Sequence, residues 1–290
     1  MDDKIINMKI IEGRDLYRIK LKHLHPINEI DFYYKLLIQS FFKMSNTIIA
    51  LSPESVFETE QERIIKNALE ELKEQKPLQY ITGEVQFRNL KLKVNSNVLV
   101  PRPETEDLVG WIIEDYINIE SSKKLLDFGT GTGCIAISLA KEQPLFETTA
   151  IDLDQDILDL AFINSQENNI NINYIKHDLT KLESLDLKVD IIVSNPPYIT
   201  PNEREAMKPN VLDYEPHQAL FVPQNDPLLF YRSILDYAQL NLNKKGNIYF
   251  EFNPLFLKEM KDLILTYSSY VTTERKDIFD KVRMLRLEKQ

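Results

Sequence analysis

The stretch Lys124-Leu125-Leu126-Asp127-Phe128-Gly129-Thr130-Gly131-Thr132-Gly133-Cys134 decides the fold of this chain. It reads as an apolar strand, a turn with glycine at alternating positions, and the start of an apolar helix that continues to Ala140. Such a turn brings backbone N–H groups close to a ligand at a helix N-terminus. The third glycine comes one residue too early for the dinucleotide fingerprint Gly-x-Gly-x-x-Gly, and the sequence has no Gly-Lys-Ser/Thr phosphate loop. A pyrophosphate is therefore not the favoured ligand.

Acidic residues follow the next two predicted strands. Strand 148–151 ends at Asp152, about 20 residues after the glycines, where a carboxylate can accept hydrogen bonds from both hydroxyls of a ribose. Strand 172–176 is followed by Asp178, which can accept a hydrogen bond from an adenine amino group. These positions favour an adenosine that carries no phosphates, and S-adenosylmethionine is such a ligand.

The tetrapeptide Asn195-Pro196-Pro197-Tyr198 ends the apolar run 189–193. Two consecutive prolines cannot continue a strand, because neither has an N–H and both fix φ at about −65°. The resulting stiff turn presents an amide side chain, a carbonyl and an aromatic face, which suit a planar substrate that carries an NH₂ group. Asn-Pro also occurs in ordinary turns, so the motif gains its meaning from the glycine turn that precedes it. Together the two features predict an amino-group methyltransferase.

Predicted strands and helices alternate from Lys123 onward, which is the pattern of a doubly wound, mostly parallel α/β sheet. We expect strands at 124–127, 148–151, 172–176, 189–194 and 247–252, helices at 134–141, 155–168, 227–242 and 254–266, and a final antiparallel edge hairpin at 269–273 and 281–287. Ligands of such sheets bind at the carboxyl ends of the strands. Four polar residues fall at these ends, namely Asp127, Asp152, Asp178 and Asn195.

The chain is expected to have three parts. Residues 1–76 read as a helical-bundle domain, because their apolar residues recur at helical spacing, and aromatics such as Phe32 and Phe41 are expected in its core. Residues 77–102 are predicted to be a β-hairpin linker. The catalytic sheet domain is expected to occupy residues 103–290.

Composition narrows the class of protein. No apolar run approaches the roughly 20 residues of a membrane span, and the acidic start Met1-Asp2-Asp3 lacks the layout of a signal peptide. The single cysteine excludes an intrachain disulfide, so we expect a cytoplasmic protein without membrane contact. At the start of a helix, Cys134 is either a reactive thiol or, more commonly, a small buried filler.

Charge and histidine content argue against two kinds of partner. The net charge is −10, and no basic stripe that would neutralise nucleic-acid phosphates is visible, so direct nucleic-acid binding is not expected. The four histidines and one cysteine do not stand at ligand spacing, so no metal site is expected. A protein substrate agrees better with this acidic balance.

Three segments, taken with the glycine turn, resemble one family. They are Pro77-Leu78-Gln79-Tyr80-Ile81-Thr82-Gly83, then Val98-Leu99-Val100-Pro101-Arg102-Pro103-Glu104-Thr105-Glu106, and then Asn195 to Tyr198. They are similar to the PrmC/HemK family, protein N5-glutamine methyltransferases that modify the Gly-Gly-Gln loop of bacterial peptide chain release factors. The resemblance runs from about Pro77 to the C-terminus. It implies a Rossmann-like class I methyltransferase sheet, an N-terminal domain that docks the release factor, conversion of S-adenosylmethionine to S-adenosylhomocysteine, and a monomer.

The resemblance also implies roles for individual residues. It gives catalytic roles to Asn195, Pro196 and Tyr198, with Pro197 completing the substrate-binding turn. The implied cofactor-binding residues are Asp127, Gly129, Thr130, Gly131, Thr132, Gly133, Asp152, Asp178, Leu179 and Asn195. Two roles stay open: Asp127 either orients the methionine amino group through water or caps the glycine turn, and Tyr198 either packs against the substrate or wedges the turn.

The chain departs from the family pattern in three places, and two other functions remain. It has Pro223-Gln224-Asn225-Asp226-Pro227 where the family is glycine-rich, and Asp280-Lys281-Val282-Arg283 in place of a late Gly-x-Asp-Arg. It also has Leu179 where an aromatic residue often follows the adenine-contacting aspartate. One rival function is a nucleic-acid adenine methyltransferase, which uses the same turn on a flipped base. The other is a non-catalytic binding module on a methyltransferase fold. The acidic charge disfavours the first rival, and the intact motifs disfavour the second.

Overall fold

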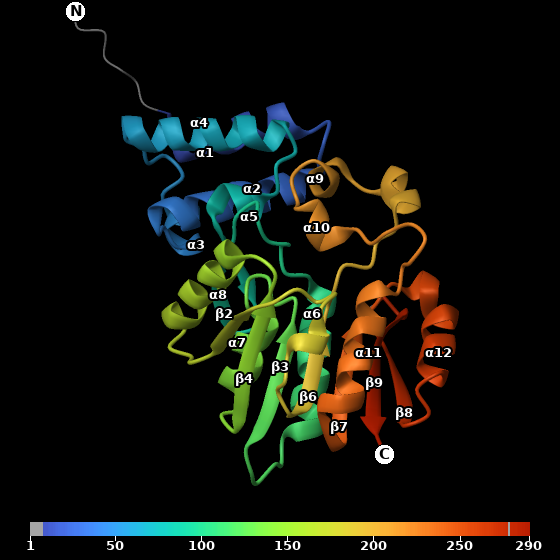
Figure 1. The fold of residues 1–290 in the computed structure, drawn as a ribbon. Coiled ribbons are helices and arrows are strands. Elements are labelled where there is room, and N and C mark those ends of the chain that lie inside the picture. The colour runs from blue at the N-terminus through green and yellow to red at the C-terminus, as the bar shows by residue number, and fades with distance from the viewer. Residues whose placement is uncertain (1–7, 278) are drawn as a thin grey trace, which may run out of the picture. The chain divides into compact units, whose positions relative to one another are not determined.

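The computed structural model describes residues 8–277 and 279–290. The segment Met1 to Asp3, on which the expectation of no signal peptide rests, lies outside the described residues. The chain forms two compact units: unit 1 is Met1–Gly83 with Pro209–Tyr214, and unit 2 is Glu84–Lys208 with Glu215–Gln290 (Figure 1). None of the described helices combines the length and apolarity that a membrane crossing requires.

Unit 1 is a bundle of helices around a core with two buried tyrosines. Its helices are α1 (Ile10–Leu21), α2 (Ile27–Phe42), α3 (Asn46–Leu51), α4 (Thr59–Lys73), α5 (Leu78–Thr82) and α9 (Pro209–Leu212). The rings of Tyr17 and Tyr34 meet edge to face with centroids 4.9 Å apart. The hydroxyl of Tyr17 donates to Ile65 O at 2.6 Å and that of Tyr34 to Ile10 O at 2.7 Å, so α1, α2 and α4 are cross-linked by satisfied polar groups.

One expected core aromatic of unit 1 is not buried. Phe41 packs against the core, as predicted. The prediction is wrong for Phe32, which is 56% exposed. Phe32 and Phe41 stand nine positions apart, which places them about 180° from each other around an α-helix, so both cannot face the same neighbouring helices.

The predicted hairpin opens unit 2. Strands β1 (Glu84–Phe87) and β2 (Leu90–Lys93) pair antiparallel across Arg88 and Asn89. The residues just before β1 form helix α5 instead of continuing the hairpin, and Gly83 ends that helix in the left-handed conformation with φ of 72°. Glycine commonly ends helices in this conformation, but the sequence analysis did not predict a helix before Gly83.

The main sheet of unit 2 has seven strands in the order β5-β4-β3-β6-β7-β9-β8. The strands are β3 (Lys123–Phe128), β4 (Phe146–Asp152), β5 (Asn173–Lys176), β6 (Val189–Ser194), β7 (Leu242–Glu251), β8 (Tyr270–Lys276) and β9 (Val282–Lys289). Strands β3 to β7 pair parallel, as predicted, whereas β9 pairs antiparallel with both β7 and β8. The predicted final hairpin is therefore confirmed, and its second strand lies inside the sheet while β8 forms the edge.

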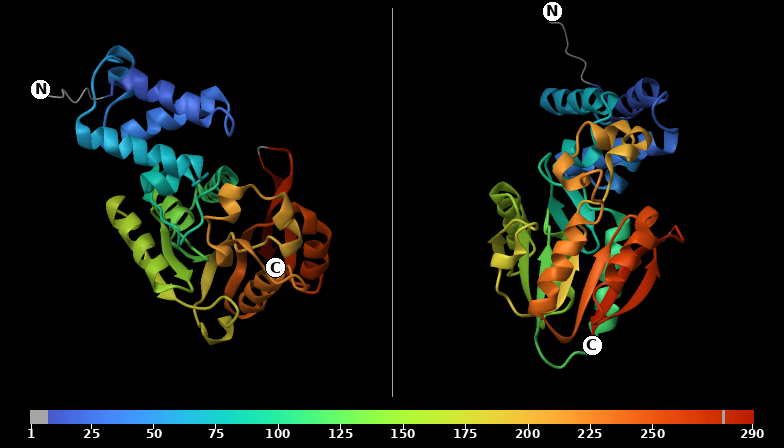
Figure 2. Two further views of the ribbon diagram at one scale, coloured as in Figure 1. Left: turned by 90° about the horizontal axis from the view of Figure 1, so that it is seen from above. Right: turned by 45° about the vertical axis from the view of Figure 1, so that its right-hand side comes forward.

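Helices cover both faces of this sheet (Figures 1 and 2). The helical elements of unit 2 are α6 (Pro103–Tyr116), α7 (Cys134–Glu142), α8 (Gln155–Glu167), η1 (Leu182–Ser184), η2 (Pro201–Ala206), α10 (His217–Leu220), α11 (Leu229–Asn241), η3 (Pro254–Phe256) and α12 (Leu257–Leu265). Alternate residues of the strands enter two cores: Leu126 packs with α11 and α12, while Leu125 packs with α6, α7 and the β1–β2 hairpin. These two layers fix the strand ends that form the site.

The glycine turn between β3 and α7 uses its glycines in two ways. Gly129 and Gly131 have φ of 75° and 54°, and a Cβ on Gly131 would meet no atom within 4 Å. At Gly133, with φ of 82°, a Cβ would lie 2.8 Å from Ile137 Cδ1 and 3.3 Å from Ala161 Cβ. The first two glycines therefore shape the turn, whereas the third lets α7 and α8 pack closely.

Gly133→Ala is expected to destabilise the protein by about 1–3 kcal/mol, because it adds a collision to a left-handed backbone. Gly129→Ala is the matched control, since it has a similar φ but its Cβ would lie 3.9 Å from the nearest atom, in Leu179. Urea unfolding followed by the fluorescence of the single tryptophan, the buried Trp111, measures both variants. Equal losses would show that backbone conformation, and not helix packing, requires glycine at 133.

Candidate active site

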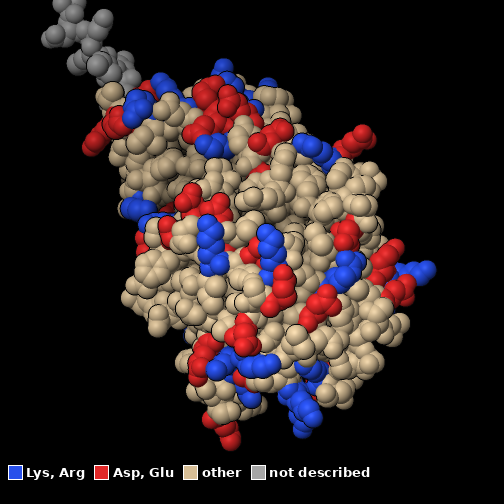
Figure 3. Space-filling model, in the orientation of Figure 1, with Lys and Arg blue, Asp and Glu red and all other residues tan. Residues whose placement is uncertain are grey.

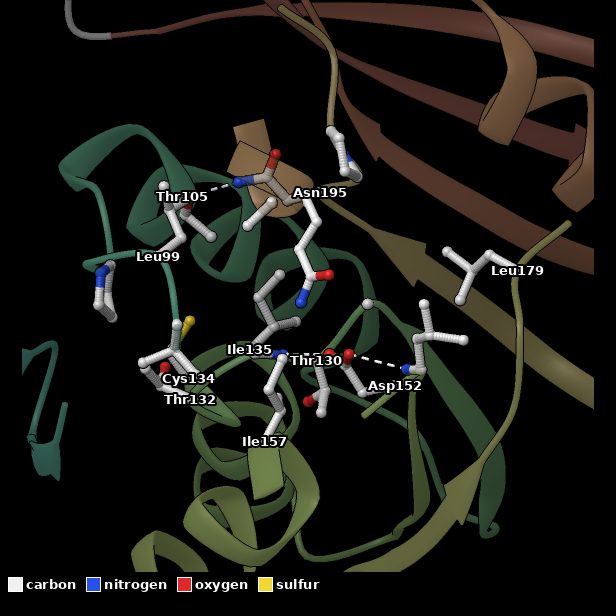
Figure 4. A pocket seen from close by; sticks show the side chains of 18 of the residues that line it. Leu99, Thr105, Thr130, Thr132, Cys134, Ile135, Asp152, Ile157, Leu179 and Asn195 are labelled. Carbon is white, nitrogen blue, oxygen red and sulfur yellow. Dashed lines mark hydrogen bonds between the residues drawn. The ribbon is translucent and has the colours of Figure 1, made fainter. Parts of the chain in front are cut away.

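A cavity of about 160 Å³ opens at the carboxyl ends of β3, β4 and β6, and all of its lining residues belong to unit 2. It brings together most of the predicted site residues, namely Gly129, Thr130, Gly131, Thr132, Asp152, Asp178, Leu179, Asn195 and Pro197. In Figure 4, Asn195 and Thr105 lie on one side of this pocket, and Asp152, Thr130 and Ile157 lie on the other. The predicted residues that do not line it are Asp127, Gly133, Pro196 and Tyr198.

Asp152, at the end of β4, supports the glycine turn and lines the pocket. Its Oδ2 accepts from the backbone N–H of Gly131 at 2.9 Å, and its Oδ1 accepts from Leu153 N–H at 2.8 Å. Burial raises the pKa of this carboxyl group, and the two N–H groups oppose the rise. Each carboxylate oxygen keeps a further lone pair, with which it can accept hydrogen bonds from a ligand.

Asp127, at the end of β3, lies beneath the turn instead of in the pocket. Its Oδ2 accepts from the hydroxyl of Thr130 at 2.7 Å. The side chain is fully buried, and this burial raises the pKa of Asp127 to about 7. Of the two roles left open by the sequence, this geometry favours capping of the glycine turn.

Asp178 and Leu179 line the pocket after β5. Asp178 Oδ1 accepts from both the backbone N–H of Thr180 at 2.9 Å and its hydroxyl at 2.7 Å. The Thr180 hydroxyl holds the pKa of Asp178 below its usual value, so the group is a charged acceptor. Leu179 is buried and offers an apolar surface beside it.

Asn195 is held by a hydrogen-bonded chain that the sequence analysis missed. Its Nδ2 donates to Thr105 Oγ1 at 3.1 Å, and that hydroxyl donates to Glu251 Oε2 at 2.7 Å. Thr105 comes from the first turn of α6 and Glu251 from the end of β7, and both are buried. The amide oxygen of Asn195 points away from Thr105 (Figure 4).

Tyr198 turns its hydroxyl toward the same carboxylate, donating to Glu251 Oε1 at 3.2 Å. Its ring packs against the core formed with α11 and α12. Nearby, the Nδ2 group of Asn253 donates to the backbone carbonyl of Tyr198 at 3.3 Å. These contacts fix the turn after Asn195 from its inner side.

An ion pair closes another part of the wall. Both carboxylate oxygens of the buried Glu215 accept from Arg102 Nη2 at 2.7 Å. Burial raises the pKa of Glu215, and the guanidinium of Arg102 opposes the rise. The pair joins the segment before α6 to the segment before α10. Two residues of α10, Gln218 and Ala219, also line the pocket.

Several other lining residues carried no recognisable signal in the sequence. They are apolar residues from separate elements, such as Ile157 of α8 and Phe230 of α11. Thr105 lies within the quoted Pro-Arg-Pro-Glu-Thr-Glu segment, which was the available signal for it. Cys134 is buried, and this burial raises the pKa of its thiol to about 12, which fits the filler role.

Comparisons with known proteins show the fold and the family of the chain. The family model described as PrmC N-terminal domain matches residues 21–83, and the one described as Methyltransferase small domain matches residues 111–212. A solved structure of a methyltransferase from Pyrococcus furiosus has a TM-score of 0.52 and 18% identity, covering 80% of this chain and 98% of its own. That likeness supports the class I methyltransferase fold.

Two curated relatives are named release factor glutamine methyltransferase. The protein from Flavobacterium psychrophilum is 44% identical, covering 89% of this chain and 92% of its own length. The protein from Bacteroides thetaiotaomicron is 35% identical, covering 92% of this chain and 96% of its own length. The resemblance noted in the sequence is thereby confirmed, and the chain belongs to the release factor glutamine methyltransferase family.

Proposed function

We propose that this protein transfers a methyl group from S-adenosylmethionine to the side-chain amide nitrogen (N5) of the glutamine in the Gly-Gly-Gln motif of peptide chain release factors. The observation that carries the proposal is the orientation of Asn195, whose NH₂ group is engaged by Thr105 beside the glycine-turn pocket. Its oxygen is then the group left to accept a hydrogen bond from a substrate NH₂. Family membership supports the same activity.

The residues of the pocket fit S-adenosylmethionine. The left-handed turn at Gly129 and Gly131 leaves open space where side chains would stand. Asp152 is the last residue of β4, the strand beside β3, and its carboxylate would accept hydrogen bonds from the ribose hydroxyls. Asp178 would accept a hydrogen bond from the adenine amino group. Leu179 and Phe230 supply apolar surface for the base. When bound, the cofactor supplies an electrophilic methyl group and leaves as S-adenosylhomocysteine.

The protein's part in catalysis is to orient the substrate. An amide nitrogen is a poor nucleophile, because its lone pair is delocalised into the carbonyl. Alignment of reacting groups can lower a barrier by about 7–11 kcal/mol in well-oriented systems. The Asn195 side-chain oxygen and the Pro196 carbonyl would accept hydrogen bonds from the two N–H groups of the glutamine amide. These two hydrogen bonds would stabilise the positive charge that grows on the nitrogen during methyl transfer.

For the other two residues of the turn we propose supporting roles. Pro197 lines the pocket and limits the freedom of the turn. Tyr198, whose hydroxyl bonds Glu251 and whose ring packs against the core, would act as the wedge that the sequence left as an alternative.

The proposed partner is a protein. On the face drawn in Figure 3, Lys and Arg side chains are interspersed with Asp and Glu, and the net charge of the chain is −10. We propose that the protein works as a cytoplasmic monomer, without nucleic acid or membrane, and that unit 1 docks the release factor. Stripped DNA serves as the negative substrate in the assays below, because methylation of adenine would point to the rival function instead.

Asp152→Ala is expected to weaken S-adenosylmethionine binding by about ten- to hundredfold, because a hydrogen bond to a charged group contributes roughly 1.5–3 kcal/mol. Calorimetry measures the dissociation constant. Asp154→Ala is the control, since Asp154 is the half-buried N-cap of α8 and does not line the pocket. Unchanged affinity in Asp152→Ala would remove Asp152 from the cofactor site.

Asn195→Ala is expected to lower kcat by about 10²–10³-fold, since it removes a preorganised acceptor at the reacting centre. Cofactor affinity should change little. Mass spectrometry of the release factor's Gly-Gly-Gln peptide, after timed incubation, measures the rate. Near-normal kcat in Asn195→Ala would mean that the turn is structural and that the proposed mechanism is wrong.

Phe32→Ser is expected to raise KM for the intact release factor by about tenfold or more, given roughly 1.5–3 kcal/mol for a buried large apolar side chain. Phe32 is 56% exposed and lines a groove of about 640 Å³ in unit 1. A short Gly-Gly-Gln peptide should be methylated as before. Leu265→Ser, at a 78% exposed position of unit 2, is the control, and an unchanged KM for Phe32→Ser would argue against docking at this groove.

A further inference from the structure

A buried carboxylate, one hydroxyl and one amide form a chain that ends at the substrate-binding asparagine. Glu251 is 1% exposed and Thr105 is 3% exposed. The distances are 2.7 Å from Thr105 Oγ1 to Glu251 Oε2 and 3.1 Å from Asn195 Nδ2 to Thr105 Oγ1. Glu251 does not line the pocket, so it can act on a substrate only through Thr105 and Asn195.

The direction of these hydrogen bonds follows from counting protons. An ionised carboxylate can only accept, so the single hydroxyl proton of Thr105 must point to Glu251. Toward Asn195 the same hydroxyl then presents only lone pairs, and it must accept from the NH₂ group of the amide. Asn195 is thereby held with its nitrogen inward, and the opposite orientation would place its oxygen against those lone pairs.

We propose that Glu251 and Thr105 are positioning residues that fix the side-chain amide of Asn195 with its oxygen toward the substrate, and that this orientation requires Glu251 to be ionised. The inference rests on the proposed function, since it concerns the amide that would hold the substrate glutamine. With the amide reversed, Asn195 would present an NH₂ group to the NH₂ group of the substrate, and two donors cannot bond to each other.

Protonation of Glu251 would release this constraint. A carboxylic acid can donate to Thr105, after which the hydroxyl proton is free to point at Asn195 and to bond its oxygen. Both orientations of the amide then find a partner, so only part of the population keeps the productive one.

Several groups around Glu251 decide its charge. Thr105 and Tyr198 donate to the carboxylate, and Arg283 on β9 favours its ionised form. Against ionisation act burial and the negative charge of Glu104 on α6. Arg283 is itself paired with the buried Asp277 at 2.7 Å, which reduces its attraction for Glu251. The net result is a pKa of Glu251 raised to about 7, with burial as the main cause.

The sign of the pH effect is therefore defined. Glu251 loses its proton as pH rises through about 7, so the constrained, productive orientation is complete above that value. Methyl transfer should fall as pH drops below it. The side-chain amide of the substrate glutamine does not titrate in this range, so an acid limb in kcat reports on the protein.

The activity test compares three variants of the full chain. Thr105→Val removes the hydroxyl at nearly constant volume and should lower kcat by about tenfold or more, whereas Thr105→Ser keeps it and should stay within about threefold of the wild type. Glu251→Gln removes the charge and should lose the acid limb between pH 6 and 8. Calorimetry should find S-adenosylmethionine affinity within about threefold of the wild type in all three, which a general collapse of the pocket would not permit.

A second readout does not depend on turnover. In protein labelled with ¹⁵N-asparagine, the side-chain NH₂ signal of Asn195, assigned by its loss in Asn195→Ala, should shift in Thr105→Val but not in Thr105→Ser. In the wild type that signal should titrate with a midpoint near 7, and in Glu251→Gln it should not titrate.

Two results would overturn the inference: equal kcat and equal Asn195 signals in the Val and Ser variants, or an acid limb that persists in Glu251→Gln. Failure of the wild type to methylate a release factor would instead overturn the proposed function. The Asn195 signal would still decide the orientation, because it needs no substrate.

Discussion

The register of three parallel strands is the constraint on which the site depends. Phe128 of β3 pairs with Ile151 of β4 on one side and with Ser194 of β6 on the other. The next residue of each strand therefore emerges at the same level of the same edge, and these residues are Gly129, Asp152 and Asn195. A slip of one residue in either pairing would move a functional side chain to the opposite face of the sheet. The two apolar layers that cover the sheet make such slips costly.

The site is built at a cost in stability that its chemistry explains. Burial raises the pKa of four carboxyl groups at or near the pocket, those of Asp127, Asp152, Glu215 and Glu251. Glu215 is paired with Arg102, whereas the other three are held by hydrogen bonds from neighbouring donors. Carboxylates kept in this way are strong, directional acceptors, and shifted pKa values of this kind concentrate at functional sites. Here they organise the two ends of one pocket: Asp127 and Asp152 the glycine turn, and Glu251 the amide of Asn195.

The sequence predicted the parts of the site whose signal is local. The glycine turn, the acidic residues after β4 and β5, and the Asn-Pro-Pro-Tyr turn each declare themselves within a few neighbouring residues, and the parallel sheet places them together. The bond between Thr105 and Glu251 joins residues 146 positions apart, and no pattern along the chain relates them. The same reason explains Phe32, which helical spacing assigned to the core, because exposure is decided by which helices pack beside it.

The path of the chain between the two units has a consequence for biosynthesis. The chain enters unit 2 at Glu84, returns to unit 1 for Pro209–Tyr214, and then leaves it again, while the hydroxyl of Tyr214 donates to Glu74 O at 2.8 Å within unit 1. Unit 1 is therefore not a segment that a ribosome completes first. Its last helix, α9, is synthesised after four of the seven sheet strands, β3 to β6. Folding of the two units is thus interleaved in time, and the nascent helical bundle must wait for more than a hundred further residues before its final piece arrives.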